Sequence, residues 1–309
     1  MIRYLSLKRK EKKMIYLMYL ILILQEESII NAQQDIPLED PSDYFKYSIS
    51  NNQVTILRYI GPGGKVIIPH IIENYLVVSI GDSAFSGNKQ ITNIIIPDSI
   101  LYIKKFAFYN CNNLEEMKLP NQLKELENEF ISKCNKIKNI TIPKSLTTIY
   151  RSMDIYWPFT NSFIEKAIIE EGTTNIISHL FYNVKTLKEV ILPMSITSIG
   201  SYAFGNCPQL NNINLHDNIP NIESYAFYFT GLTSIKLPEK IKEISFGLFY
   251  NCRQLRTIIL PQNITTIYKE AFYNCVSLTE IELPDQITFI GPSSFYNCNN
   301  LEEMKLPNQ

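Results

Sequence analysis

Residue types on which catalysis and nucleotide binding depend are scarce in this 309-residue chain. It has three histidines, one tryptophan and eleven glycines, few for a catalytic or nucleotide-binding chain of this size. Neither sign of charge dominates, with 29 Lys and Arg against 30 Asp and Glu, so no strongly basic surface is available to hold nucleic acid. A hydrophobic content of 45% supplies ample material for a core and excludes a wholly disordered chain.

Long apolar runs are also missing. The longest, residues 14–24, has eleven uncharged residues, whereas a bilayer-spanning helix needs roughly 20. Six basic residues precede this run, and residues 30–32 (Ile-Asn-Ala) follow it, which is the pattern of an export signal. We therefore expect residues 1–32 to be a signal peptide and the mature chain to lack a membrane span. A buried strand or helix of the domain is the alternative.

A motif of the form Ile/Leu-x-Leu/Ile-Pro recurs through the chain, mostly at intervals of about 23 residues. Its prolines are Pro69, Pro97, Pro120, Pro143, Pro193, Pro238, Pro261, Pro284 and Pro307. Glu170 and His216 take the proline position in two degenerate copies. Neither a helical nor a strand period continues through a whole unit, so each unit must be a coil containing short strands.

One coil has too few apolar residues to fold alone, but stacked coils share a continuous core. The repeats therefore predict a repeat solenoid of about ten units, with the array at residues 69–309. Residues 33–68 are expected to form an N-terminal leader or cap hairpin, in which the Gly-Pro-Gly-Gly stretch at residues 61–64 is interpreted as a hairpin turn.

The unit Leu-x-x-Ile-x-Leu-Pro-x-x-Ile-x-x-Ile-x-x-x-Ala-Phe-x-x-Cys resembles the BspA-type (Treponema-type) leucine-rich repeat. Its Ala-Phe pairs are at Ala84-Phe85, Ala107-Phe108, Ala203-Phe204, Ala226-Phe227 and Ala271-Phe272, and its cysteines are Cys111, Cys134, Cys207, Cys252, Cys275 and Cys298. Departures are Ile131 in place of phenylalanine, the degenerate Glu170 unit and the shortened unit that ends at Pro238. The array also stops at Gln309 without a cap, so we expect either a fragment or pairing at that end.

This resemblance implies a leucine-rich-repeat fold, a β-rich right-handed horseshoe or arc. It also implies secreted or surface proteins of bacteria and mucosal protists that bind host extracellular proteins or other cells.

The six cysteines occupy one position of the repeat, fourteen residues after the proline. Stacking should align them in a ladder of small buried hydrophobic side chains. A disulfide or a metal site is the alternative, because export would permit oxidation. We favour unpaired thiols and expect no cofactor.

Two more ladders are predicted beside the cysteines. One contains Tyr109, Tyr182, Tyr228, Tyr250, Tyr273 and Tyr296, and the other contains Asn110, Asn183, Asn206, Asn251, Asn274 and Asn297. Tyrosine supplies large contact area at low entropic cost, so a recognition stripe is one interpretation. We favour a self-stacking outer ladder whose amides bond to the turn backbone.

Residues two and four positions before each proline should face outward on the concave side. Ile168 and Ile191 would then form a small apolar patch rimmed by Lys166 and Glu189, and such patches are typical of partner sites. The same outward row continues through Asn214, Lys236 and Ile259. The alternative is that β-branched residues simply suit exposed strands.

Two glycosylation sequons are present, at Asn139 and Asn263. A glycan on Asn139 would crowd the predicted face.

No constellation of catalytic residues is apparent. The only sizeable insertion, residues 151–163, contains Asp154 but neither histidine nor cysteine. The sequence therefore predicts a non-enzymatic binding protein, secreted or on the cell surface, with a role in adhesion. An intracellular repeat scaffold is the alternative.

Overall fold

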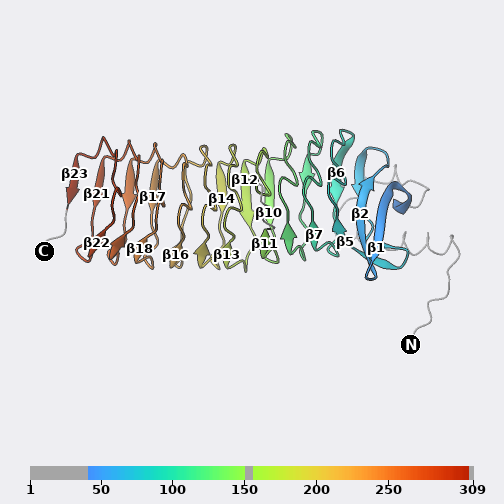
Figure 1. Ribbon diagram of the computed structural model, residues 1–309, viewed down its shortest axis with the longest axis horizontal. Coiled ribbons are helices and arrows are strands. Elements are labelled where there is room, and N and C mark those ends of the chain that lie inside the picture. Colours follow the sequence, from blue (N-terminus) through green and yellow to red (C-terminus); the bar gives the residue numbers. More distant parts are fainter. Residues whose placement is uncertain (1–40, 150–155, 306–309) are drawn as a thin grey trace, which may run out of the picture. The chain divides into compact units, whose positions relative to one another are not determined.

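A computed structural model describes residues 41–149 and 156–305. The chain divides into two compact units, residues 1–44 and 45–309, and the second holds the repeats. This unit is a β-solenoid of about ten turns of roughly 23 residues, which confirms the predicted repeat fold (Figure 1). Within the described residues the only helical segment is a 3-10 turn, η1 (Pro41–Tyr44). The predicted signal peptide at residues 1–32 lies outside the described residues.

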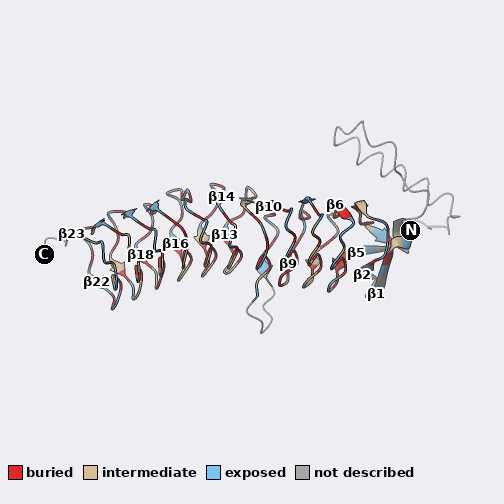
Figure 2. Cartoon of the chain, turned by 90° about the horizontal axis from the view of Figure 1, so that it is seen from above, coloured by how far each residue is buried: buried red, intermediate tan, exposed pale blue. Residues whose placement is uncertain are grey.

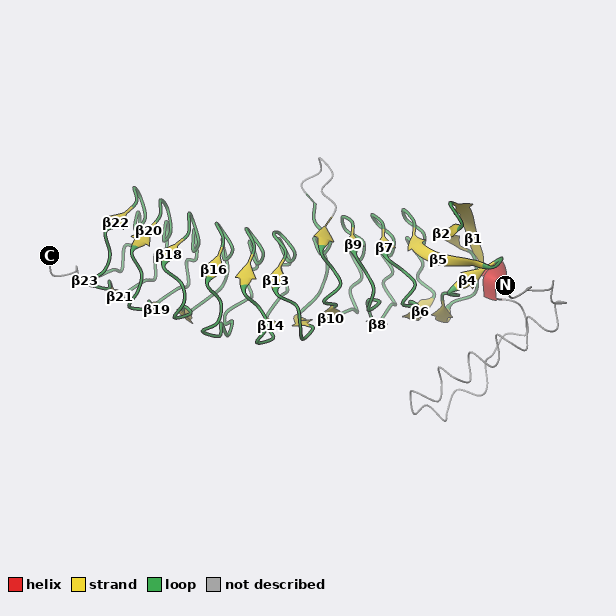
Figure 3. Cartoon of the chain, turned by 90° about the horizontal axis from the view of Figure 1, so that it is seen from below, coloured by secondary structure: helices red, strands yellow, loops and turns green. Residues whose placement is uncertain are grey.

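Each coil contributes one short strand to each of two faces, except the coil of Asn214, which has no strand before its proline site. Strands of neighbouring coils pair in parallel and in register, so that Lys166 pairs with Glu189, and Ile168 with Ile191, of the following coil. Residues at equivalent positions of successive repeats therefore lie over one another, because each repeat makes one full turn of the solenoid. Figure 3 shows the two files of short strands with loops and turns between them.

Strands that precede the repeat proline form what we call the proline-side face. They are β3 (Gly64–Ile67), β6 (Ile91–Ile95), β8 (Glu116–Met117), β10 (Asn139–Ile142), β12 (Lys166–Ile169), β14 (Glu189–Ile191), β17 (Ser234–Lys236), β19 (Thr257–Ile259), β21 (Glu280–Glu282) and β23 (Glu303–Lys305). Their hydrogen bonding divides them into four sheets, β3-β6-β8, β10-β12-β14, β17-β19 and β21-β23.

Strands that follow the proline form the return face. They are β5 (Tyr75–Ile80), β7 (Tyr102–Ile103), β9 (Glu125–Leu126), β11 (Thr148–Ile149), β13 (Asn175–Ile176), β15 (Ser198–Ile199), β16 (Asn221–Ile222), β18 (Glu243–Ile244), β20 (Thr266–Ile267) and β22 (Phe289–Ile290). Most contain two residues, one outward and one buried isoleucine or leucine, so the period-2 signal in the sequence is too short to be seen alone.

An antiparallel hairpin begins the array. Strands β1 (Phe45–Ser50) and β2 (Gln53–Tyr59) are joined by Asn51 and Asn52, whose φ angles of 51° and 60° are those of a type I′ turn. Strand β2 pairs in parallel with β5, so the hairpin passes directly into the return face. The short strand β4 (Ile71–Ile72) also pairs with β5.

The prediction of a hairpin turn at residues 61–64 is wrong. This segment carries the chain from β2, on the return face, to β3, which pairs with β6 on the proline-side face. A Cβ on Gly63 would lie 2.4 Å from Gln90, and Gly64 has a φ of 81°, so both positions require glycine. Close approach to the next coil accounts for Gly63, and the left-handed backbone conformation accounts for Gly64.

A file of phenylalanine rings runs through the core. Phe181, Phe204, Phe227 and Phe249 are fully buried, with successive ring centroids 5.8 Å apart and nearly parallel planes. Figure 2 shows that buried and exposed segments alternate along the coils. Stacked rings of this size bury a large apolar area between neighbouring coils.

Ile131 interrupts this file, as the sequence indicates. The adjacent Phe130, at the position that alanine takes in other coils, is fully buried and contacts Phe159 edge-on at 5.4 Å. In this coil the larger side chain is at the alanine position and the smaller one is at the phenylalanine position, so the total volume is similar and the core remains filled where the ring stack is broken.

The six thiols form the predicted ladder. Five are buried, Cys298 is half-buried, and all six are free. The raised pKa of Cys207, about 12, follows from its burial.

Candidate interaction surface

The predicted apolar pair lies in the sheet β10-β12-β14, on its central strand and one edge strand. Ile168 in β12 and Ile191 in β14 are directly opposite each other in the parallel register and are 37% and 41% exposed. The alternating residues Ala167 and Val190 point inward and are buried. The two neighbouring strands are each buried on one face only, and on the other face each presents one isoleucine to solvent.

Ion pairs border this apolar pair. Lys166 and Glu189 lie four positions before the proline site, and their side chains are 3.0 Å apart. One residue earlier in each coil, Glu165 contacts Lys188 at 2.7 Å and Lys138 at 3.2 Å. Hydrogen bonds to Lys188 and Lys138 lower the pKa of Glu165. Charged side chains therefore border the two isoleucines.

The remaining predicted residues lie further along the same row. Lys236 and Ile259 pair in register in the sheet β17-β19, and Ile259 is 60% exposed. Asn214 is exposed but belongs to no strand, and hydrogen bonding between the two sheets is interrupted at its coil. The structure therefore brings Lys166, Ile168, Glu189 and Ile191 together in one sheet, and Lys236 and Ile259 in another.

Lys236 is the centre of a second charged group. Its Nζ lies 3.2 Å from Glu239 and 3.6 Å from Asp217. The hydrogen bond to Glu239 and the charge of Asp217 raise the pKa of Lys236. Two carboxylates against one ammonium make this part of the face locally negative.

Met194 is a further exposed apolar side chain of the Ile191 coil and was not predicted. It directly follows Pro193 at the end of the Ile191 coil and is 62% exposed. A signal for it exists in the sequence, because the residue after the proline site is polar or charged elsewhere in the array: Asp98, Asn121, Lys144, Glu171, Asp217, Glu239, Gln262 and Asp285.

The two sequons differ in their surroundings. Asn139 is the first residue of β10, is exposed, and lies beside Lys166 in the register. Asn263 is half-buried, and its side-chain nitrogen donates a hydrogen bond to the backbone oxygen of Glu239 at 2.9 Å. Asn139 is therefore the more exposed of the two asparagines.

Tyrosine and asparagine ladders line the turn-rich edge of the array. Tyr273 stacks on Tyr250 at 4.6 Å and on Tyr296 at 4.8 Å. The amide of Asn274 donates to Asn251 at 2.8 Å, and that of Asn297 donates to Asn274 at 2.7 Å. The amides therefore bond to one another instead of to the turn backbone, which corrects the predicted contact. Asparagine suits this position because its φ lies near 60°.

A second aromatic file runs beside these tyrosines and was missed in the sequence. Trp157 stacks on His179 at 4.0 Å, His179 on Tyr202 at 5.0 Å, and Tyr202 on Tyr225 at 4.7 Å. Burial, and then the neighbouring Tyr202 and Glu270, raise the pKa of Tyr225 to about 12. The rings cover each other's faces, so these files stabilise the stack of coils. Their spacing, close to one repeat length, is the signal that could have revealed them.

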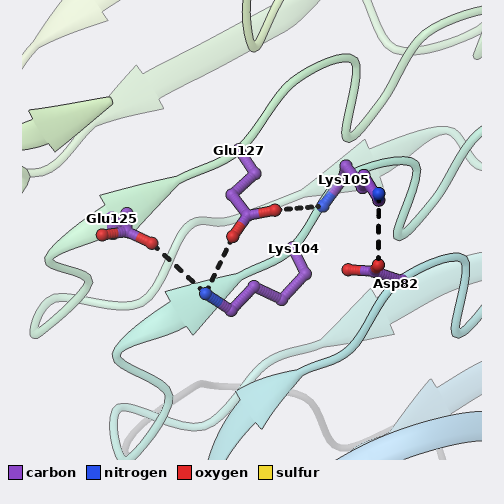
Figure 4. Close-up of polar contacts among 5 residues, drawn as sticks. All are labelled: Asp82, Lys104, Lys105, Glu125 and Glu127. Atoms are coloured by element: carbon purple, nitrogen blue, oxygen red, sulfur yellow. Dashed lines mark hydrogen bonds and ion pairs between the residues drawn. The ribbon is translucent and has the colours of Figure 1, made fainter. Parts of the chain in front are cut away.

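Charges on the return face also connect neighbouring coils (Figure 4). Glu127 accepts a hydrogen bond from Lys104 Nζ at 2.8 Å and another from the backbone N–H of Lys105 at 3.1 Å. Glu125 contacts the same ammonium at 3.3 Å. Burial lowers the pKa of Lys104, but the hydrogen bonds and charges of Glu127 and Glu125 outweigh it, and the pKa is raised.

Across residues 41–149 and 156–305, no group of three or more His, Cys, Asp or Glu side chains is placed so that it could hold a metal ion. Over the same residues, no helix is long and apolar enough to cross a bilayer.

Comparison with known proteins identifies the repeats. The model of the BspA type leucine rich repeat region matches residues 67–154, 156–266 and 220–309, with six copies. The T. pallidum leucine rich repeat protein is 26% identical over 78% of this chain and 90% of that chain, with a TM-score of 0.42. A leucine-rich repeat protein from Bacteroides ovatus is 23% identical over 87% and 94%, with a TM-score of 0.48.

No curated protein sequence matches the chain significantly. The repeat model nevertheless covers well over half of it, and the in-register coils agree with that match. The chain belongs to the BspA-type leucine-rich repeat family.

Proposed function

We propose that this protein is a secreted or cell-surface protein that binds other proteins without catalysis and acts in adhesion to host or other cells. Membership of a family whose repeats build extended faces for protein binding supports this function. The basic and apolar N-terminal segment supports export, with residues 1–32 as the signal peptide.

The binding surface that we propose is the proline-side face, centred on Ile168 and Ile191. The exposure of these two adjacent isoleucines is the observation that carries the proposal, because Thr141 and Asn214 take the same position in the flanking coils. An apolar centre with a polar rim is the common anatomy of a protein interface. Lys166, Glu189, Asn214, Lys236 and Ile259 complete the proposed surface.

The test measures binding of the purified full chain to a panel of extracellular matrix and cell-surface proteins. The double variant Ile168→Asp/Ile191→Asp should weaken binding at least about tenfold, since each change places a charge against an apolar contact. Leu57→Asp is the matched control, because Leu57 is 48% exposed but lies in the N-terminal hairpin. Equal binding by the double variant and the parent would remove this surface from the function.

Export has its own test. Expression of the full chain in a secreting host should give a mature N-terminus at Gln33, measured by N-terminal sequencing. Retention of Met1 on an intracellular product would instead favour the scaffold function.

A further inference from the structure

Eight consecutive outward positions of the proline-side face read the same from both ends. Two positions before the proline site, these eight coils present Ile95, Lys118, Thr141, Ile168, Ile191, Asn214, Lys236 and Ile259. From either end the order is isoleucine, lysine, a small polar residue and isoleucine. We propose that this face pairs with the same face of a second copy of the chain, an inference that rests on the proposed use of this surface.

The symmetric placement of the apolar residues in this order suits an isologous dimer. In a two-fold interface each residue i contacts residue j of the partner, and j contacts the partner's i, so the surface must be complementary to its own reversed copy. A two-fold axis parallel to the strands, placed between β12 and β14, puts Ile168 opposite the partner's Ile191. The two exposed isoleucine pairs then cover each other.

The charged rows fit the same axis. Lys166 comes to lie opposite the partner's Glu189, and Glu165 opposite the partner's Lys188. Within one copy Lys166 already contacts Glu189 at 3.0 Å, and Glu165 contacts Lys188 at 2.7 Å. Each pair from one copy would meet the reversed pair of the other, giving two rings of four alternating charges. Such a network is favourable because every ammonium has two carboxylate neighbours.

The flanking positions also match. Asn139 would lie opposite the partner's Asn212, and Thr141 opposite the partner's Asn214, so polar groups meet polar groups. Lys118 would lie opposite the partner's Lys236. That contact is compensated, because Lys236 lies between Asp217 and Glu239, which leave the group with a net negative charge.

The predicted interface is small. Eight coils at about 4.8 Å per strand span about 38 Å, and the outward rows are about 12 Å wide, so each copy would bury roughly 450 Å². A total of about 900 Å² is below the size of stable interfaces, and we therefore expect a reversible dimer with a dissociation constant on the order of 100 µM.

Sedimentation equilibrium of the full chain from about 10 µM to 1 mM tests self-association. A monomer–dimer equilibrium is expected, weakened at least about tenfold by Ile168→Asp/Ile191→Asp and unchanged by Leu57→Asp. A monomer throughout this range, or equal association by the double variant, would overturn the proposal.

Cross-linking tests the symmetry. Asn139→Cys and Asn212→Cys place single thiols three coils apart on one copy but opposite each other across the two-fold axis. A mixture of the two variants, oxidised with a small disulfide, should form covalent dimers several-fold faster than either variant alone, with the parent chain as the control for Cys298. Equal rates in the mixture and in either single variant would overturn the two-fold arrangement.

The two proposals fail separately. Binding of extracellular proteins by a chain that stays monomeric would reject only the dimer. Self-association without any loss of partner binding in the double variant would reject only the proposed partner surface.

Discussion

The sulfur of Cys252 lies 3.0 Å from the backbone oxygen of Phe227, one coil earlier in the array. The same contact recurs at each of the other five cysteines, whose sulfurs lie 2.9–3.2 Å from the equivalent carbonyl oxygen. Each thiol therefore donates a second hydrogen bond to a carbonyl that already accepts a backbone N–H within its own turn. Cysteine suits this position because it is small and apolar yet still a donor.

Removing one of these donors should destabilise the array. Cys275→Ala deletes the hydrogen bond to Phe249 and leaves a small cavity, so we expect a loss of about 1–2 kcal/mol in the free energy of unfolding. Cys275→Thr should cost less, because Thr230 takes the equivalent position in its own coil, where it is buried and contacts Cys252 at 3.2 Å. Urea unfolding followed by circular dichroism measures both values, and equal stability of all three proteins would contradict the role of the thiol.

The thiols should also differ in reactivity. Burial raises the pKa of Cys252 and of Cys298 to about 11, so little thiolate is present near neutral pH. Because Cys298 is half-buried and the others are buried, an aromatic disulfide reagent should modify Cys298 first in the folded chain. Its rate should rise about tenfold per pH unit between pH 8 and 10. Rapid modification of all six thiols without denaturant would contradict the ladder.

The phenylalanine file predicts a larger effect. Phe204 lies between Phe181 and Phe227 in the ring stack, and Phe204→Ala should cost about 3–5 kcal/mol in the free energy of unfolding. Phe204→Leu keeps much of the volume and should cost about 1–1.5 kcal/mol. Met194→Ala, at an exposed position, should change stability by less than about 0.5 kcal/mol and serves as the control in the same urea titration.

The ion pairs of Glu165 predict a dependence on pH. Lys188 and Lys138 lower the pKa of Glu165 in the folded state, so the ionised carboxylate stabilises the fold at pH values above the ordinary pKa of a glutamate side chain. This stabilisation is lost as the pH falls through the lowered pKa of Glu165 in the folded state. Glu165→Gln should therefore melt below the parent at pH 7 and approach it at acidic pH. A constant difference in melting temperature, or the same trend in Glu243→Gln on the return face, would argue against these pairs.

The two sequons should differ in glycan occupancy when the chain is expressed in a eukaryotic secretory pathway. We expect a glycan on the exposed Asn139 and little on Asn263, whose amide is bonded to Glu239 in the folded coil. Glycopeptide mass spectrometry gives both occupancies, with Asn139→Gln as the control. High occupancy at Asn263 would show that its hydrogen bond does not oppose modification.

Much of the architecture could be predicted because the repeat itself encodes it. Prolines, Ala-Phe pairs and cysteines at a constant spacing place equivalent residues over one another once the coils stack, and the thiol ladder follows directly from that spacing. The outward position of Ile168 and Ile191 follows in the same way from alternation along a strand.

Contacts between coils were less predictable. The role of Gly63 depends on the approach of Gln90 from the next coil, and the amide ladder depends on how close two asparagines come in successive turns. Neither distance is contained in the spacing of the residues.

The sequence by itself determined the coil length, the residues that face the core and the family, because a short constant period admits few ways to bury its apolar positions. Only the tertiary structure decided which side chains become neighbours, such as the pairing of Lys166 with Glu189 and the stacking of Trp157 on His179. These contacts depend on the register and the rise between neighbouring coils. Both are determined by the hydrogen bonds that connect the coils along the whole stack.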